Sequence, residues 1–78
     1  MPRFFFHVRD GDSLTEDPDG SELPDLAAAL AEALAAAREL AAERIKAGKG
    51  PDGRRFEIGD AAGRTLATVP FRAALDPG

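Results

Sequence analysis

The fold is decided by one stretch, residues 24–47, with the sequence PDLAAALAEALAAARELAAERIKA. Its apolar residues recur at spacings of three and four, which places them on one stripe of an α-helix. The stripe consists of Leu23, Leu26, Leu30, Ala33, Leu34, Ala37, Leu40, Ala41 and Ile45. Pro24 suits the first turn of a helix, and Gly48 suits the position after the last turn. The stretch therefore predicts one amphipathic helix of about 36 Å, at roughly 1.5 Å per residue.

A second set of alanines lies beside this stripe, at positions 27, 28, 31, 35 and 42. Alanine has the highest helix propensity, so a half-exposed helix face explains this set most simply. The alternative is a smooth surface on which another backbone can approach closely. Under that hypothesis, Ala27, Ala31 and Ala35 are possible interface residues.

The segments on either side of the helix predict four β-strands. They span residues 3–9, 13–17, 54–59 and 64–69, and turns rich in Gly and Asp join each pair. In the first strand, Phe4, Phe6 and Val8 alternate with Phe5 and His7, so both strand faces are partly apolar. Leu14 in the second strand, and Phe71 and Leu75 in a final helical turn, are expected to point into the core.

The order β-β-α-β-β predicts an α+β fold in two layers. Two hairpins joined by a crossover through the helix give a four-stranded antiparallel sheet of order 2-1-3-4, packed on one long helix. A single helix covers one sheet face, so Phe5 and His7 should lie on the other. An exposed aromatic side chain on an open sheet face is a candidate interface.

Length and composition limit the function classes. The 78 residues, 1–78, make one small domain, and the chain has no cysteine for disulfides or thiolate metal sites. A net charge of −4 argues against general nucleic-acid binding. No apolar run reaches the length of a membrane span, and the opening residues lack the features of a signal peptide, so a cytoplasmic location is expected. Small domains without covalent staples often oligomerise, which favours a homodimer.

The acidic residues are concentrated near the start of the chain. Asp10, Asp12, Glu16, Asp17 and Asp19 lie in predicted turns. Counted from Asp10, the sixth position of a calcium loop is occupied by threonine instead of glycine, so the EF-hand pattern fails. Aspartate stabilises turns through its own side chain, which is the simpler interpretation. The alternatives are weak divalent-ion binding and a surface for a basic protein partner.

No catalytic or cofactor site is predicted. His7 is the only histidine, and no nearby residue pattern supports a catalytic triad. Residues 48–50 contain two glycines and a lysine but lack the spacing of a phosphate-binding loop. Arg54 and Arg55, with Lys46 and Lys49, form a small basic group that is interpreted as part of a solvated loop.

Residues 1–11, with the sequence MPRFFFHVRDG, resemble a family of small bacterial proteins that is common in rhizobia and opens with M-P-R-[FY]-F-F-H. The resemblance continues in ELPDL at 22–26, DGRRFEI at 52–58 and VPF at 69–71. The family is a domain of unknown function, so the resemblance implies a bacterial α/β domain with no established activity. A weaker similarity to HicB-type antitoxin domains rests on strands followed by Pro-Asp-Leu and a helix rich in Ala and Glu.

These observations lead to two functional hypotheses. The first is a non-enzymatic interaction module without a cofactor, self-associating through the open sheet face at Phe5 and His7 or through the alanines at 27, 31 and 35. The alternative is a HicB-like antitoxin or regulatory protein whose acidic turns bind a basic partner. Neither hypothesis involves nucleic acid or a membrane.

Overall fold

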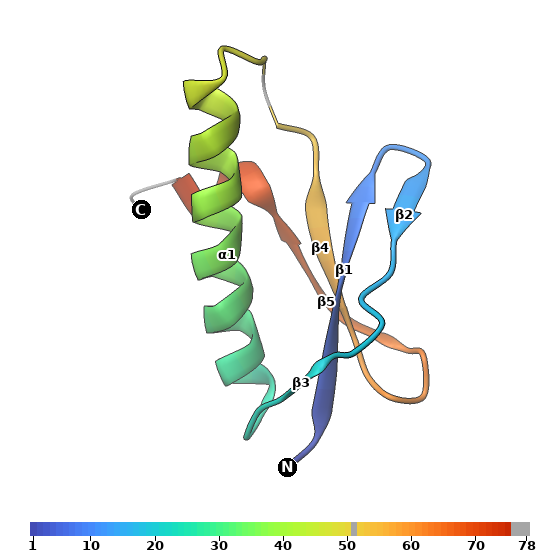
Figure 1. Ribbon diagram of the computed structural model, residues 1–78. Helices are drawn as coiled ribbons and strands as arrows, with labels where there is room; N and C mark the ends of the chain where they lie inside the picture. Colours follow the sequence, from blue (N-terminus) through green and yellow to red (C-terminus); the bar gives the residue numbers. More distant parts are fainter. Residues whose placement is uncertain (51, 76–78) are drawn as a thin grey trace.

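The computed structural model describes residues 1–50 and 52–75. One helix packs against one face of an antiparallel sheet, which confirms the α+β class and the two layers (Figure 1). The elements in chain order are β1 (Arg3–Asp10), β2 (Ser13–Thr15), β3 (Ser21–Glu22), α1 (Leu26–Lys46), β4 (Arg55–Gly59), β5 (Thr65–Pro70) and the 3-10 helix η1 (Phe71–Leu75).

The predicted helix is present but begins two residues later than expected. Asp25 has an extended backbone, and its side chain accepts a hydrogen bond from the Ala28 N–H at 2.9 Å. This carboxylate satisfies one of the free N–H groups of the first turn and so fixes the start at Leu26. Arg44 and Lys46 lie in the last turn, where their charges suit the negative helix end.

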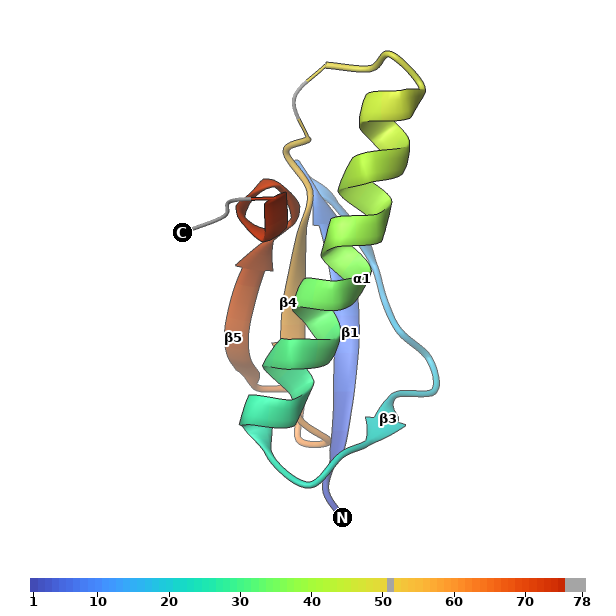
Figure 2. The ribbon, with the colours of Figure 1, turned by 90° about the vertical axis from the view of Figure 1, so that its left-hand side faces the viewer.

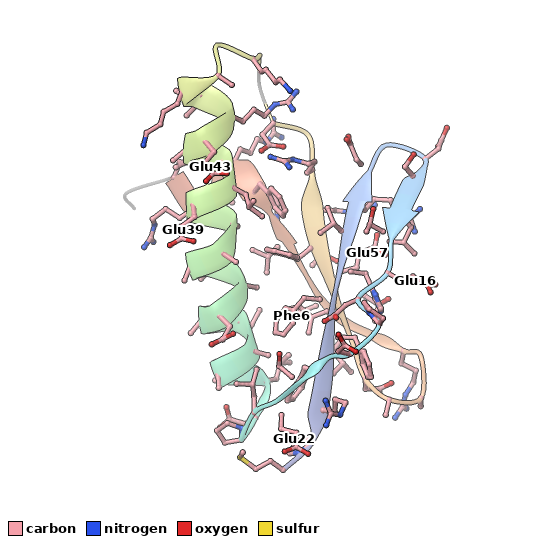
Figure 3. The ribbon with its side chains drawn as sticks, viewed as in Figure 1. Phe6, Glu16, Glu22, Glu39, Glu43 and Glu57 are labelled. Carbon is pink, nitrogen blue, oxygen red and sulfur yellow. The ribbon has the colours of Figure 1, made fainter. Side chains whose placement is uncertain are left out.

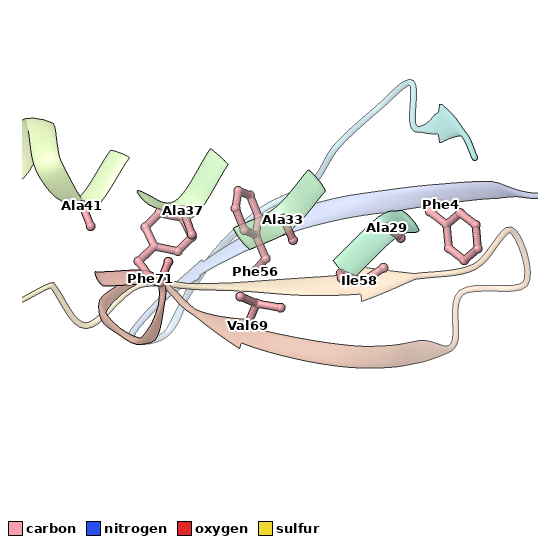
Figure 4. Packing of buried hydrophobic residues seen from close by; sticks show 10 residues of the cluster. Phe4, Ala29, Ala33, Ala37, Ala41, Phe56, Ile58, Val69 and Phe71 are labelled. Carbon is pink, nitrogen blue, oxygen red and sulfur yellow. The ribbon is translucent and has the colours of Figure 1, made fainter. Parts of the chain in front are cut away.

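The buried face of α1 is made of alanine, with leucine at its margins. The four buried helix residues are Ala29, Ala33, Ala37 and Ala41, spaced four apart (Figure 4). Small side chains let the helix backbone approach the aromatic and branched residues of the sheet closely. The predicted stripe is thus corrected at three positions, because Leu34 and Ile45 are exposed and Ala29, which the stripe did not include, is fully buried.

Opposite these alanines, the sheet and η1 supply the large side chains of the core. Ile58 and Phe71 are fully buried, and the rings of Phe56 and Phe71 have centroids 4.7 Å apart. Figure 2 shows η1 beside α1, in front of the sheet. Phe71 therefore closes the core as predicted, but Leu75 does not, since Ala74 is the buried residue of that turn.

The sheet has five strands instead of four. The order is β2-β1-β4-β5, and the additional strand β3 pairs with β1 through Arg3↔Glu22 and Phe4↔Ser21. A two-residue strand gives no periodicity signal, which is why the sequence did not indicate it.

The register of the β1–β2 hairpin corrects the predicted orientation of Leu14. Asp10 pairs with Ser13 across a two-residue turn, so Arg9 pairs with Leu14. Directly paired residues share a sheet face, and Arg9 lies on the face away from α1. Leu14 therefore lies on the outer face, 39% exposed.

None of the helices in the described part of the chain combines the length and the apolar character that crossing a membrane requires.

Candidate functional site

The face of the sheet away from α1 is called here the open face. The strand registers align His7, Glu57 and Thr68 in one row across β1, β4 and β5. Figure 3 shows Phe6 pointing toward α1 and Glu57 pointing away from it. A neighbouring row consists of Leu14, Arg9, Arg55 and Pro70.

The centre of the open face is an ion-pair ladder. Arg9 Nε lies 3.0 Å from Glu57 Oε2, and Arg55 Nη2 lies 3.3 Å from the same oxygen. The hydrogen bond from Arg9 and the charges of both arginines hold the pKa of Glu57 below its usual value, against the opposing effect of burial. The glutamate side chain is only 16% exposed, so most of it is covered within the chain.

Phe5 and His7 lie on the same face as a stacked pair. Their rings are 6.2 Å apart with an interplanar angle of 9°. The expected exposed aromatic is corrected here, because Phe5 is half-buried. The loop between β2 and β3 covers Phe5. Gly20 of this loop lies so close that an added Cβ would be only 2.9 Å from the Phe5 ring.

Asp17 holds this loop on β1. Its carboxylate accepts the Phe6 N–H at 3.1 Å, and its own N–H donates to His7 Nδ1 at 3.1 Å. Burial raises the pKa of Asp17, but hydrogen bonds from the N–H groups of Phe6, Gly20 and Asp19 outweigh it and leave the pKa lowered. The side chains of His7 and Asp17 thus both form hydrogen bonds within the chain.

The other four acidic residues of the predicted partner surface, Asp10, Asp12, Glu16 and Asp19, are exposed. Asp10 and Asp12 lie at the β1–β2 hairpin, and Glu16 and Asp19 lie in the loop before β3. Across residues 1–50 and 52–75, no group of three or more acidic, histidine or cysteine side chains could hold a metal ion.

The alanines proposed as an interface, Ala27, Ala31 and Ala35, are all exposed on the outer side of α1. They are distinct from the four alanines that pack on the sheet. The structure therefore places the two sets on different sides of one helix.

Arg54 is not the solvated loop residue that the sequence indicated. Its guanidinium forms a two-point ion pair with Asp52, with Nη2 2.8 Å from Oδ2 and Nε 2.9 Å from Oδ1. The same group lies 4.8 Å from the centre of the Phe71 ring and bonds the Leu40 carbonyl. It thereby ties the start of β4 to both α1 and η1. Arg55 is likewise paired, with Glu57.

A groove at the C-terminal end of α1 was not predicted from the sequence. The groove has a volume of 330 Å³ and is lined by Ala41, Arg44, Ile45, Lys49, Gly50, Asp52, Arg72 and Leu75. Ile45 is 62% exposed and Leu75 41%. The sequence places Ile45 in the core by its helical spacing and Leu75 by its position in the final turn, and it contains no signal for the exposure of either residue.

Comparison with known proteins places the chain in a family. Neither the curated proteins nor the solved structures contain a match to it. A family of domains matches residues 3–72, which is most of the chain and includes α1, the five strands and the first two residues of η1. The chain belongs to this family, described as DUF6894, a domain of unknown function.

Proposed function

We propose that this domain is a non-enzymatic protein-interaction module that binds through the open face, with a second copy of the chain as its partner. The observation behind the proposal is that α1 covers one sheet face only, while the other face has ordered aromatic and ion-paired side chains. Side chains that are fixed before binding lose little conformational entropy on association, which favours affinity.

The residue types on the open face support this use. Aromatic residues and arginine are enriched at the centres of protein interfaces, and this face has Phe5, His7, Arg9 and Arg55 together. His7 Nδ1 accepts a backbone N–H, which supports a structural role for the only histidine of the chain. A structural role for His7 agrees with a non-enzymatic function.

The test uses one variant on the open face and one on the outer helix. Thr68 is exposed and lies beside Glu57 at the end of the row that begins with His7, so Thr68→Arg adds a long charged side chain to the open face on its edge strand β5. Ala35→Arg adds the same group to the alanine side of α1. Light scattering across a dilution series measures the solution mass of both variants and of the unmodified chain.

We expect Thr68→Arg to lower the mass from dimer to monomer and Ala35→Arg to leave a dimer. The reverse pattern would assign the interface to the outer helix. An unmodified chain that stays monomeric at all concentrations would contradict self-association.

A second candidate is capture of a basic protein, in the manner proposed from the similarity to antitoxin domains. The exposed Asp10, Asp12, Glu16 and Asp19 favour it, because they follow one edge of the sheet and none of them forms a salt bridge within residues 1–50 and 52–75. The test is binding of a basic protein encoded beside this one, which Asp12→Lys should weaken and the Glu39→Lys control on α1 should not.

A further inference from the structure

The groove at the end of α1 combines an apolar floor with a basic rim. Ala41, Ile45 and Leu75 provide the apolar surface, and Arg44, Lys49 and Arg72 lie around it. Asp52 also lines the groove, but its carboxylate is paired with Arg54. Exposed isoleucine and leucine side chains lose contact with water when a partner covers them, which stabilises the complex. Three cations around such a surface favour a partner segment that is both apolar and acidic.

The chain contains one segment with this chemistry. In the β1–β2 hairpin, Leu14 is 39% exposed and is flanked by Asp12 and Glu16, with Asp10 at the start of the turn. These three carboxylates are opposite in charge to the three cations of the groove. The leucine between them is an exposed apolar side chain, as are Ile45 and Leu75 in the groove.

The hairpin and the groove lie at the same end of the molecule. Figure 1 shows the β1–β2 turn and the C-terminal end of α1 at the top of the fold, on either side of β4. Arg54 pairs with Asp52 of the groove. The pKa of Arg54 is raised by this hydrogen bond and, more weakly, by the charge of Asp10, which agrees with an acidic turn near the basic end. Two copies that meet end to end can therefore form the same contact twice about a two-fold axis.

From this complementarity we infer that the groove at the end of α1 receives the β1–β2 hairpin of a second copy of the chain. Leu14 of one copy contacts Ile45 and Leu75 of the other, and Asp12 and Glu16 face Lys49 and Arg72. The contact goes beyond the proposed function, because the groove lies at the helix end and not on the open face. Only Leu14, on the edge strand β2, belongs to the open face as well.

The experiment reverses the charge of each surface separately. One variant combines Lys49→Glu with Arg72→Glu, and the other combines Asp12→Lys with Glu16→Lys. All four residues are exposed, and their side chains make no hydrogen bond or ion pair within the described residues, so folding should be unaffected. Circular dichroism checks the fold, and Lys46→Glu is the matched control outside the groove. Sedimentation velocity measures association of each variant and of an equimolar mixture.

In either variant alone, groove and hairpin have the same sign of charge, so self-association should weaken by about tenfold or more. In the mixture, an acidic groove meets a basic hairpin and a basic groove meets an acidic hairpin. The mixture should therefore form a one-to-one heterodimer, which 1 M salt weakens, because the Debye length falls to about 3 Å. Lys46→Glu should associate like the unmodified chain.

Three results would overturn the inference: a monomeric unmodified chain, variants that associate unchanged, or a mixture that stays monomeric. Thr68→Arg separates this contact from the open face. If Thr68→Arg removes self-association and the charge reversals do not, the open face is the interface and the groove contact is wrong. If the charge reversals remove it and Thr68→Arg does not, the groove contact stands without the open face.

Discussion

The two faces of the sheet differ both in their residues and in what covers them. On the inner face, Phe56 and Ile58 pack against alanines of α1 and are almost fully buried. On the open face, Phe5 stacks on His7 beneath a loop and stays half-exposed. Side chains along β1 and β4 point alternately to the two faces. Those on the inner face stabilise the fold by packing, and those on the open face are held by hydrogen bonds and ion pairs. The inner face thus depends on packing, and the open face on polar contacts that a partner could extend.

The largest expected effect comes from removing a large buried side chain from the core. Phe71 is fully buried against Phe56 and Arg54, so Phe71→Ala should lower the free energy of unfolding by about 3–5 kcal/mol. A domain of this size has a stability of only about 5–15 kcal/mol. Denaturant titration should show a large loss for Phe71→Ala and a smaller one for Phe5→Ala. Equal losses would mean that the two faces contribute alike to stability.

The next effect comes from filling the space between helix and sheet. Ala37 is fully buried, so Ala37→Leu should cost about 1–3 kcal/mol by overpacking. Ala35→Leu adds the same atoms on the exposed side of α1 and should change stability by about 0.5 kcal/mol at most. Thermal unfolding of the pair measures the difference. If both variants were neutral, the alanines would not set the distance between α1 and the sheet.

The sequence was sufficient for the inner face and not for the open one. The helix, the two hairpins and the burial of Phe71 followed from periodicity and turn residues, because these signals are local. The burial of Phe5 depends on Gly20 and Asp17, which reach β1 from a loop that has no periodicity.

The exposure of Ile45 and Leu75 was missed for a related reason. An apolar residue in register with a buried stripe looks the same in sequence whether or not the sheet extends beneath it. Here α1 extends beyond the part of the core that could cover Ile45. The same reasoning applies to Leu14, whose face depends on the length of one turn.

The loop that covers Phe5 can be tested with two glycines. Gly20 and Gly11 both have positive φ angles, of 69° and 61°, so replacement by alanine strains either backbone by about 1–2 kcal/mol. A Cβ at Gly20 would also lie 2.9 Å from Phe5 and Arg3, whereas none of the described atoms lies within 4 Å of one at Gly11. Gly20→Ala should therefore destabilise the domain by about 1 kcal/mol more than Gly11→Ala, through overlap with its neighbours. Equal unfolding free energies would indicate that the loop does not rest on Phe5.

The smallest expected effect concerns the ion-pair ladder and appears in the pH dependence of stability. Because the pKa of Glu57 is lower in the folded chain than its usual 4.5, the carboxylate stabilises the fold fully above that pH, and the contribution disappears as the pH falls through the folded value. Glu57→Gln removes this titration while keeping the side-chain shape, so its stability should decline less steeply below pH 4.5 than that of the unmodified chain. Asp60 also has a lowered pKa, caused mainly by the Arg64 N–H, but it lies in the β4–β5 turn, so Asp60→Asn is the matched control. Since both replacements remove one titrating group, a flatter acid limb in each would show only that carboxylates stabilise this fold.

The open face is distinguished by how its stability responds to salt. Glu57 is nearly covered and contacts two arginines, whereas the Arg3–Glu22 pair is exposed. In 1 M salt, the loss of stability caused by Glu57→Gln should therefore change less than the loss caused by removing the Arg3–Glu22 pair. Equal salt sensitivity would mean that the ladder is solvated like any surface pair and is not held in order for a partner.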